Sequence, residues 1–150
     1  MTASQDIFRA YDIRGVYGDE LNAEIGERVG LAFGNYLLRS QSNGKVSIGC
    51  DARVSSPELQ EAVSRGISKA GFEVDIIGMV PIPVANFTTW KASSTSEPYL
   101  GGVYITASHN PAEYNGIRFR HPDGTGYTEG NIEIKKIFFE DELIEADTVG

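Results

Sequence analysis

The sequence predicts an α/β layered domain with a mostly parallel mixed sheet flanked by helices. Two observations lead to this prediction. Segments of strand character alternate along the chain with segments of helical periodicity, and glycine, proline or serine separates them. The 150 residues also match the size of a single compact domain. Because alternating strands and helices favour parallel pairing, we expect residues 1–150 to form one such domain.

The N-terminal third predicts one strand and one long helix. Residues 7–18 alternate apolar and polar side chains and then reach glycine, which indicates a short strand followed by a loop. Residues 22–40 have the apolar spacing of a helix, with Asn22 as a suitable N-cap. Three glycines at intervals of four share one face of this helix. They predict a close backbone approach to the sheet or to a neighbouring helix: Gly26, Gly30 and Gly34.

The middle third begins with a strand over residues 45–50 and continues with a second helix. Ser55-Ser56-Pro57-Glu58 combines a serine cap, a proline in the first turn and an early glutamate, all of which favour a helix start. Gly71 ends this helix, whose buried stripe is Leu59, Val63, Ile67 and Ala70. The elements expected next are a strand over 73–77, a stiff proline turn over 79–83 and a helix over about 84–91.

The C-terminal third predicts two strands and a last helix. The strands cover residues 101–106 and 115–120, and within the second we expect Asn115-Gly116 to turn the chain so that residue 118 approaches the loop after the first. Residues 129–143 have helical spacing, with inward-facing Ile134, Ile137 and Phe138.

The overall charge excludes several classes of partner. A net charge of −8 argues against nucleic acid, which requires a clustered positive field, and against an anionic membrane surface. A small anionic ligand remains compatible, because a few arginines and backbone N–H groups form a local anion site. We find no signal-type segment and no uncharged run of membrane-spanning length, so we expect a cytoplasmic protein. Cys50 is the single cysteine and is expected to be a buried thiol.

The richest candidate site is the loop Thr106-Ala107-Ser108-His109-Asn110-Pro111, which follows a buried strand. Ligands of open α/β sheets gather at the carboxyl ends of strands, so Ser108 lies where a ligand is expected. From the residues alone, three interpretations compete. The loop is a plain polar turn, the nucleophile of a serine hydrolase, or a serine that carries a phosphoryl group. The hydrolase lacks a Gly-x-Ser-x-Gly elbow, and His109 is poorly placed as base for its own neighbour.

Four segments, in the same order along the chain, resemble signature segments of the α-D-phosphohexomutases. The loop around Ser108 continues into Tyr114-Asn115-Gly116-Ile117-Arg118, which completes the family's phosphoserine loop. The residues of these segments are closer to those of the phosphomannomutase/phosphoglucomutase branch than to those of the phosphoglucosamine mutases. The other three segments are Phe8-Arg9-Ala10-Tyr11-Asp12-Ile13-Arg14-Gly15, Gly49-Cys50-Asp51-Ala52-Arg53-Val54-Ser55-Ser56-Pro57-Glu58-Leu59 and Gly78-Met79-Val80-Pro81-Ile82-Pro83.

The resemblance implies a phosphotransferase of the isomerase class that interconverts hexose 1-phosphate and hexose 6-phosphate. Ser108 would carry the phosphoryl group, a hexose 1,6-bisphosphate would serve as intermediate and activator, and His109 would lie beside the reacting group. An oxygen of the serine phosphate would be one ligand of Mg²⁺. The other metal ligands, the sugar loop and the phosphate-anchoring loop belong to three further domains that residues 1–150 do not contain. We therefore expect the chain alone to be inactive, and a non-catalytic phosphosugar-binding module is the alternative.

Three further residues match family positions near the reacting group. Arg14 matches an arginine that approaches the active centre, with a surface ion pair to Asp12 or Asp19 as the alternative. Tyr11 is expected either to line the same site or to pack along the strand. Arg118 is a departure, because the family commonly has a lysine there that is discussed as a general base. Arginine cannot give up its proton, so Arg118 would steady phosphate charge and leave base catalysis to another group such as His109.

One more arginine allows two interpretations. Arg53 lies in the loop before the second helix, where it would either reach phosphate or pair with Asp51, and pairing is the interpretation that we prefer.

Overall fold

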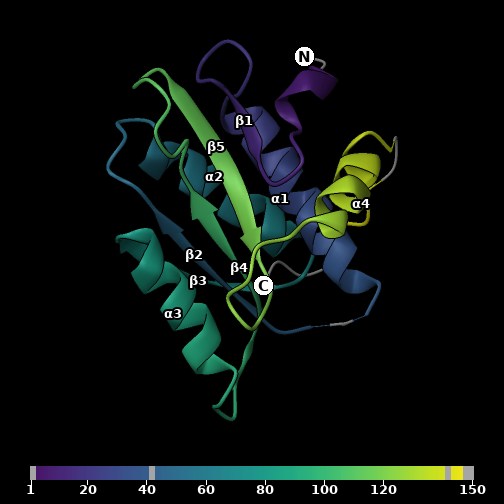
Figure 1. Cartoon of the computed structure of the whole chain (residues 1–150). Coiled ribbons are helices and arrows are strands. Elements are labelled where there is room, and N and C mark those ends of the chain that lie inside the picture. Colours follow the sequence, from purple (N-terminus) through teal and green to yellow (C-terminus); the bar gives the residue numbers. More distant parts are fainter. Residues whose placement is uncertain (1–2, 41–42, 141–142, 147–150) are drawn as a thin grey trace.

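Five short strands form a single sheet in the order β1-β5-β4-β2-β3 in the computed structural model, which describes residues 3–40, 43–140 and 143–146 (Figure 1). β5 runs against the other four, because it pairs antiparallel with β1 and β4 while β2 pairs parallel with β3 and β4. The predicted mixed, mostly parallel sheet is therefore confirmed. The strands are β1 (Ile13–Val16), β2 (Lys45–Cys50), β3 (Glu73–Met79), β4 (Tyr99–Ile105) and β5 (Tyr114–Arg120).

Helices cover both faces of this sheet (Figure 1). The helices are α1 (Ala23–Leu38), α2 (Ser56–Lys69), α3 (Ile82–Ala92) and α4 (Glu129–Phe138), with a short 3-10 helix η1 at Gln5–Ile7. Two successive glycines of β4 show which helix lies on which face of the sheet. Gly101 faces Phe33 of α1, whereas Gly102 faces Thr89 of α3. Since neighbouring residues of a strand point to opposite faces, α1 and α3 lie on opposite sides of the sheet.

The glycines of α1 lie against α2, as one of the two predicted approaches requires. A Cβ atom at Gly30 would come within 2.1 Å of the Val63 carbonyl oxygen. Gly66 of α2 completes the contact, since a Cβ there would come within 1.9 Å of the Glu27 carbonyl oxygen. The two helix backbones therefore touch, and this contact fixes how α2 packs against α1.

Most predicted starts and ends of elements are confirmed. The Asn22 side chain caps α1 by accepting a hydrogen bond of 2.9 Å from the Ile25 amide. Gly71 follows α2 with a positive φ of 93°, which glycine adopts without strain. α3 begins at Ile82, so Pro83 lies in its first turn instead of before it. Proline is accepted there because the first amides of a helix have no intrahelical partner.

The last helix is shorter than predicted. α4 ends at Phe138, and residues 139–140 are not helical, while 141–142 lie outside the described residues. The side chain of Asn35 draws the following segment onto α1. Its Nδ2 donates to the Ile144 carbonyl and its Oδ1 accepts from the Ile144 amide, at 2.9 and 2.8 Å. Tertiary hydrogen bonds thus replace a further helical turn.

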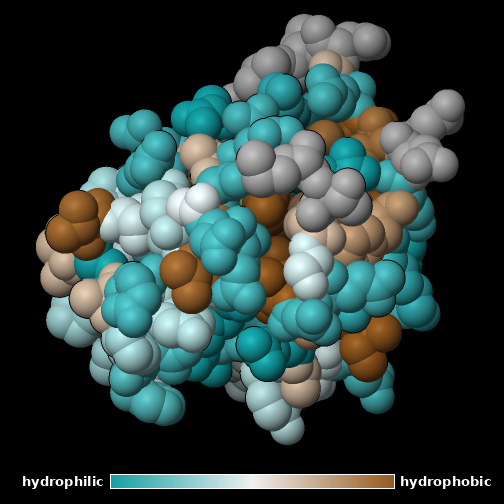
Figure 2. All heavy atoms as spheres, turned by 90° about the horizontal axis from the view of Figure 1, so that it is seen from above, coloured by the Kyte–Doolittle hydropathy of each residue, from teal (hydrophilic) through white to brown (hydrophobic). Residues whose placement is uncertain are grey.

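The core and the surface agree with the composition. Phe33 stacks on Phe119 with ring centroids 4.5 Å apart at the centre of the α1 side. Cys50 is buried, and burial raises the pKa of its thiol, as expected for an inert cysteine. Seen from above, the surface is mainly hydrophilic, with hydrophobic side chains in separate small groups (Figure 2). In the described parts of the chain, no helix combines the length and apolar character needed to cross a membrane.

Candidate functional site

Ser108 lies in the loop between β4 and β5 with a backbone φ of +57°. Among the described residues it is the one non-glycine residue with a positive φ. This left-handed conformation costs an L-amino acid roughly 1–2 kcal/mol. Local bonds hold it: the Ser108 amide donates to Thr106 Oγ1 at 2.9 Å, and the Asn110 amide donates to the Ala107 carbonyl at 3.1 Å. A strained residue that the surroundings hold in place is a reason to look for function.

The Ser108 hydroxyl is open to a ligand. Ser108 and His109 are exposed, while the preceding Ala107 is buried. His109 Nδ1 lies 3.3 Å from Ser108 Oγ, a long hydrogen bond. The hydroxyl faces a cavity of about 730 Å³. Its lining residues are Arg9, Tyr11, Asp12, Arg14, Ser108, His109, Asn110, Pro111, Tyr114 and Arg118.

Two arginines share one carboxylate in this cavity. Arg14 Nη2 forms a short ion pair with Asp12 Oδ2, and Arg118 Nε lies 4.0 Å from the same oxygen. Arg14 Nη1 also donates to Asn110 Oδ1 at 3.0 Å, which ties the β1 arginine to the Ser108 loop. The Nε atoms of Arg14 and Arg118 are buried and make no hydrogen bond among the described residues.

The charges in the cavity wall favour an anion. Three arginines line it, including Arg9, and Asp12 is the single carboxylate in the lining. Asp12 is only 7% exposed, so its charge is directed at the arginines and not at water. Unsatisfied guanidinium donors and excess positive charge are the features that bind phosphate groups. This local site contrasts with the net charge of −8 for the whole chain.

All five residues predicted for the site line this one cavity: Tyr11, Arg14, Ser108, His109 and Arg118. Tyr11 is 61% exposed and lies outside β1, so it lines the rim and does not pack along the strand. Arg14 pairs with Asp12 and also contacts the Ser108 loop through Asn110. The pair is largely buried, with side-chain exposures of 19% and 8%, so it is not a surface ion pair, and the role of Arg14 at the active centre stays a prediction. Sequence reasoning missed Arg9, although it lies in the same N-terminal segment as Tyr11 and Arg14.

The predicted turn at Asn115-Gly116 is wrong, because both residues lie within β5. Asn115 is fully buried, and its Nδ2 donates to Ser55 Oγ at 2.8 Å and to Ser56 Oγ at 3.0 Å. The chain turns earlier, where the Tyr114 amide donates to the Pro111 carbonyl at 3.1 Å. Arg118 still reaches the cavity, because β5 returns alongside β4.

Arg120, two residues beyond Arg118 on β5, belongs to the scaffold. Its Nε donates to Asn86 Oδ1 of α3 at 2.8 Å, and its side chain lies largely buried. Burial lowers the pKa of Arg120, and the charge of Arg118 adds to this effect. Arg118 is therefore the arginine of this strand that is available to a ligand.

The described residues of this chain do not make a magnesium site by themselves. Mg²⁺ prefers an octahedron of oxygen ligands, mainly carboxylates, phosphates and water. In the cavity, the Asp12 carboxylate is already committed to Arg14 and Arg118. The described residues contain no group of three or more His, Cys, Asp or Glu side chains placed to hold a metal. A phosphate on Ser108 would add one oxygen ligand, and no carboxylate of the cavity is free to add a second.

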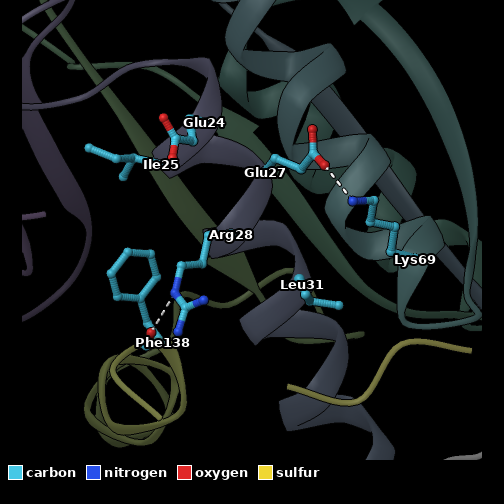
Figure 3. Close-up of a pocket in the computed structure, with 7 residues that line it drawn as sticks. All are labelled: Glu24, Ile25, Glu27, Arg28, Leu31, Lys69 and Phe138. Carbon is cyan, nitrogen blue, oxygen red and sulfur yellow. Dashed lines mark hydrogen bonds and ion pairs between the residues drawn. The ribbon is translucent and has the colours of Figure 1, made fainter. Parts of the chain in front are cut away.

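A second hollow, of about 360 Å³, lies between α1, α2 and α4 (Figure 3). Its charged groups already have protein partners. Arg28 Nε donates to the Phe138 carbonyl at 2.9 Å, and Lys69 Nζ lies 2.9 Å from Glu27 Oε1. The hydrogen bond from Lys69, with help from Arg65, lowers the pKa of Glu27. Paired charges leave nothing to bind an ion, so this hollow is not a second candidate site.

The chain is similar to one sequence family. A family described as "Phosphoglucomutase/phosphomannomutase, alpha/beta/alpha domain I" matches residues 5–145. A probable phosphoglucosamine mutase of Pyrococcus horikoshii is 41% identical over 131 residues, which cover 87% of this chain and 27% of the relative. A phosphomannomutase/phosphoglucomutase of Pseudomonas aeruginosa is 41% identical over 117 residues, 78% of this chain and 24% of the relative. These two relatives therefore do not separate the two branches of the family.

Solved structures are similar over the same region. A phosphoglucomutase/phosphomannomutase family protein from Burkholderia thailandensis aligns with a TM-score of 0.81 and 37% identity, over 91% of this chain and 30% of that one. A putative phosphomannomutase from Thermus thermophilus aligns with a TM-score of 0.80 and 28% identity, with the same two coverages of 91% and 30%. The chain thus spans less than a third of the length of these relatives.

Proposed function

The chain belongs to the phosphoglucomutase/phosphomannomutase family, and from this we propose that it is the phosphoserine-bearing first domain of a phosphohexomutase. In this proposal Ser108 exchanges a phosphoryl group with a hexose phosphate, and a hexose 1,6-bisphosphate is the intermediate. The metal loop, the sugar loop and the phosphate-anchoring loop come from three further domains. A cytoplasmic location and a preference for mannose or glucose phosphates are part of the same proposal.

One observation supports this proposal above the others. An exposed serine in a strained backbone conformation faces a cavity lined by three arginines and one buried carboxylate. A serine hydroxyl that receives a phosphoryl group needs positive charge around the phosphate oxygens, since the charge of a loose transition state is spread over them. Arg14 and Arg118 line the cavity, so their guanidinium groups can supply that charge.

In the proposed transfer step, each bond and each proton can be accounted for. The bond between phosphorus and Ser108 Oγ breaks, a bond from phosphorus to the sugar oxygen forms, the sugar hydroxyl gives up its proton, and the released Ser108 oxygen takes up a proton to become a hydroxyl again. Arg118 keeps its own proton and cannot accept this one, so it stabilises charge only. His109 is the candidate acceptor, because its Nδ1 lies 3.3 Å from Ser108 Oγ. Arg14 fixes the loop through Asn110 while it faces the same cavity.

Intact-mass spectrometry tests the role of Ser108. The purified chain is incubated with glucose 1,6-bisphosphate and Mg²⁺, and we expect one added phosphoryl group that maps to Ser108. Ser108→Ala removes the addition, whereas Ser93→Ala, an exposed serine beyond the end of α3, retains it. Binding of the sugar phosphate without a mass change would favour the non-catalytic binding module. Acylation of Ser108 by an ester probe would favour a hydrolase, and absence of both labelling and binding would reject the proposal.

A further inference from the structure

Arg53 lies behind the Ser108 loop and donates to four of its backbone carbonyl groups. The residue follows β2, in the turn before α2, and its side chain is only 13% exposed. Its Nη2 donates to the carbonyls of Ser108 and Asn110 at 3.0 and 2.8 Å. Its Nη1 donates to the carbonyls of Pro111 and Tyr114 at 2.6 and 3.0 Å. One side chain therefore spans the loop from its serine to the start of β5.

These contacts use every donor that Arg53 has. A guanidinium carries five N–H groups, and the fifth, Nε, donates to Asp51 Oδ2 at 3.2 Å. None is left for a phosphate oxygen. Arg53 thus differs from Arg14 and Arg118, whose Nε atoms make no hydrogen bond with any described residue. The sequence interpretation in which Arg53 pairs with Asp51 is confirmed, and the one in which it reaches phosphate is wrong.

Asp51 extends the same network to the start of the loop. Its Oδ2 accepts from Thr106 Oγ1 at 2.7 Å, and that hydroxyl accepts from the Ser108 amide at 2.9 Å. Its Oδ1 accepts from Ser56 Oγ at 2.6 Å, which anchors the carboxylate at the first turn of α2. The Asp51–Arg53 pair therefore holds both the amide and the carbonyl of Ser108.

The network also decides which loop groups face the ligand. Asp51, Arg53 and Asn110 line a separate hollow of about 500 Å³ on the other side of the loop. The N–H and C=O of a trans peptide point in opposite directions. Because the Ser108 carbonyl points at Arg53, the His109 N–H points away from Arg53. Asn110 separates the two hollows. Its backbone carbonyl accepts a hydrogen bond from Arg53, and its side-chain oxygen accepts one from Arg14.

We propose that Arg53, held by Asp51, is a positioning residue that keeps Ser108 in its left-handed conformation and presents its hydroxyl and the His109 amide to the transferred group. The nature of that group rests on the proposed function, whereas the loop geometry does not. Lysine is not equivalent at this position. All three N–H donors of lysine are on one nitrogen atom, so a lysine side chain cannot donate to four carbonyl groups and a carboxylate at the same time.

The test compares Arg53→Ala and Arg53→Lys with Arg65→Ala, an arginine of α2 that is half-exposed and makes one ion pair, to Glu27. Two measurements follow the loop: the backbone chemical shifts of Ser108, which report its φ, and amide hydrogen exchange at Ser108 and Asn110. We expect both Arg53 variants to lose the left-handed shifts and the protection. Millimolar guanidinium should restore them in Arg53→Ala, because it refills the vacated position, while sodium should not.

A third measurement follows the rate of Ser108 phosphorylation by glucose 1,6-bisphosphate. Misplacement of a reacting group by about 1 Å costs on the order of 100-fold in rate, so we expect a loss of that size at saturating donor. The half-saturating concentration should change little, because Arg53 does not touch the ligand. The Arg65 variant should match the wild type in all three measurements.

Two results would overturn the positioning role. The first is an Arg53→Ala or Arg53→Lys chain that keeps the Ser108 shifts and protection. The second is a disordered loop that is phosphorylated at the wild-type rate. If the wild-type chain is not phosphorylated at all, the proposed function fails, and the shifts, exchange and guanidinium rescue still decide the role of Arg53. Should Arg53→Ala not fold, the lysine variant provides the same comparison.

Discussion

Arg118 is the main departure from the resemblance to the phosphohexomutases, and its surroundings indicate an electrostatic role. It lies on β5 opposite Tyr104 and approaches the buried Asp12 carboxylate that also pairs with Arg14. A permanently charged guanidinium so placed attracts phosphate and cannot remove a proton. The proton that leaves the sugar hydroxyl must therefore go elsewhere, and His109 is the nearest imidazole to Ser108 Oγ.

We predict that Arg118→Gln weakens binding of glucose 1-phosphate to the Ser108 cavity about tenfold, the loss expected for one charged hydrogen bond of roughly 1.5 kcal/mol. Calorimetric titration measures this, and Arg39→Gln, an arginine paired with Glu133 outside the cavity, should bind as the wild type does.

Arg118→Lys tests separately whether the site lacks a proton acceptor. We expect it to slow Ser108 phosphorylation, because a point charge replaces a fork of donors. A large gain in rate would instead show that a proton acceptor was missing.

Residues near Ser108 show how far the sequence predicts a site. The position of Ser108 at a strand end follows from local pattern, because strand and loop are local features. The Arg53 network does not, since it joins residues 55–61 positions apart and depends on which way each carbonyl turns. Asn115-Gly116 has turn composition and is nevertheless a strand, because the buried Asn115 amide bonds to two serines at the start of α2.

At the scale of elements, the backbone contact between α1 and α2 fixes how the two helices pack. The glycines of α1 indicated a close approach, but the partner glycine on α2 was not recognised, since Gly66 has no repeat to mark it. The length of α4 could not be predicted either. Apolar spacing continues to Leu143, and yet this residue packs on the core from a non-helical segment that Asn35 holds against α1. Periodicity shows that a residue is buried and not how the chain reaches it.

We predict that Gly66→Ala lowers the free energy of unfolding by about 3 kcal/mol, because a Cβ atom cannot occupy a position 1.9 Å from the Glu27 carbonyl oxygen and the helices must separate. In a helix interior alanine is otherwise more stabilising than glycine. The predicted loss therefore requires that the steric clash outweigh the higher helix propensity of alanine. Urea denaturation followed by circular dichroism measures the change. Glu61→Ala, on the exposed face of the same helix, should stay within about 0.5 kcal/mol of the wild type. Equal stability of Gly66→Ala would mean that the helices are not in backbone contact.

On the scale of the whole molecule, the Ser108 cavity offers part of what the proposed phosphoryl exchange requires. It has a candidate carrier, a candidate proton acceptor and arginines for the phosphate charge. The described residues offer no metal cluster, and the chain covers 24–30% of the length of the relatives compared above. That the remaining groups come from further domains stays a prediction from the sequence, because the recognised motifs all match one domain of the family. The sequence could not predict the sugar preference, since no sugar-recognition loop is among these residues.

We predict that the chain accepts one phosphoryl group at Ser108 but does not sustain mutase turnover. After one transfer, the hexose bisphosphate must reorient and return its other phosphoryl group while it remains bound. Arginines on one wall of an open cavity hold a phosphate but do not retain the sugar through that rotation.

A coupled assay for glucose 6-phosphate, with glucose 1-phosphate, Mg²⁺ and a trace of glucose 1,6-bisphosphate, should show at most one turnover per chain, and mannose phosphates should behave alike. The full-length Pseudomonas aeruginosa relative is the comparison enzyme. Product that exceeds the molar amount of chain many times over, and that disappears in Ser108→Ala, would show that one domain suffices.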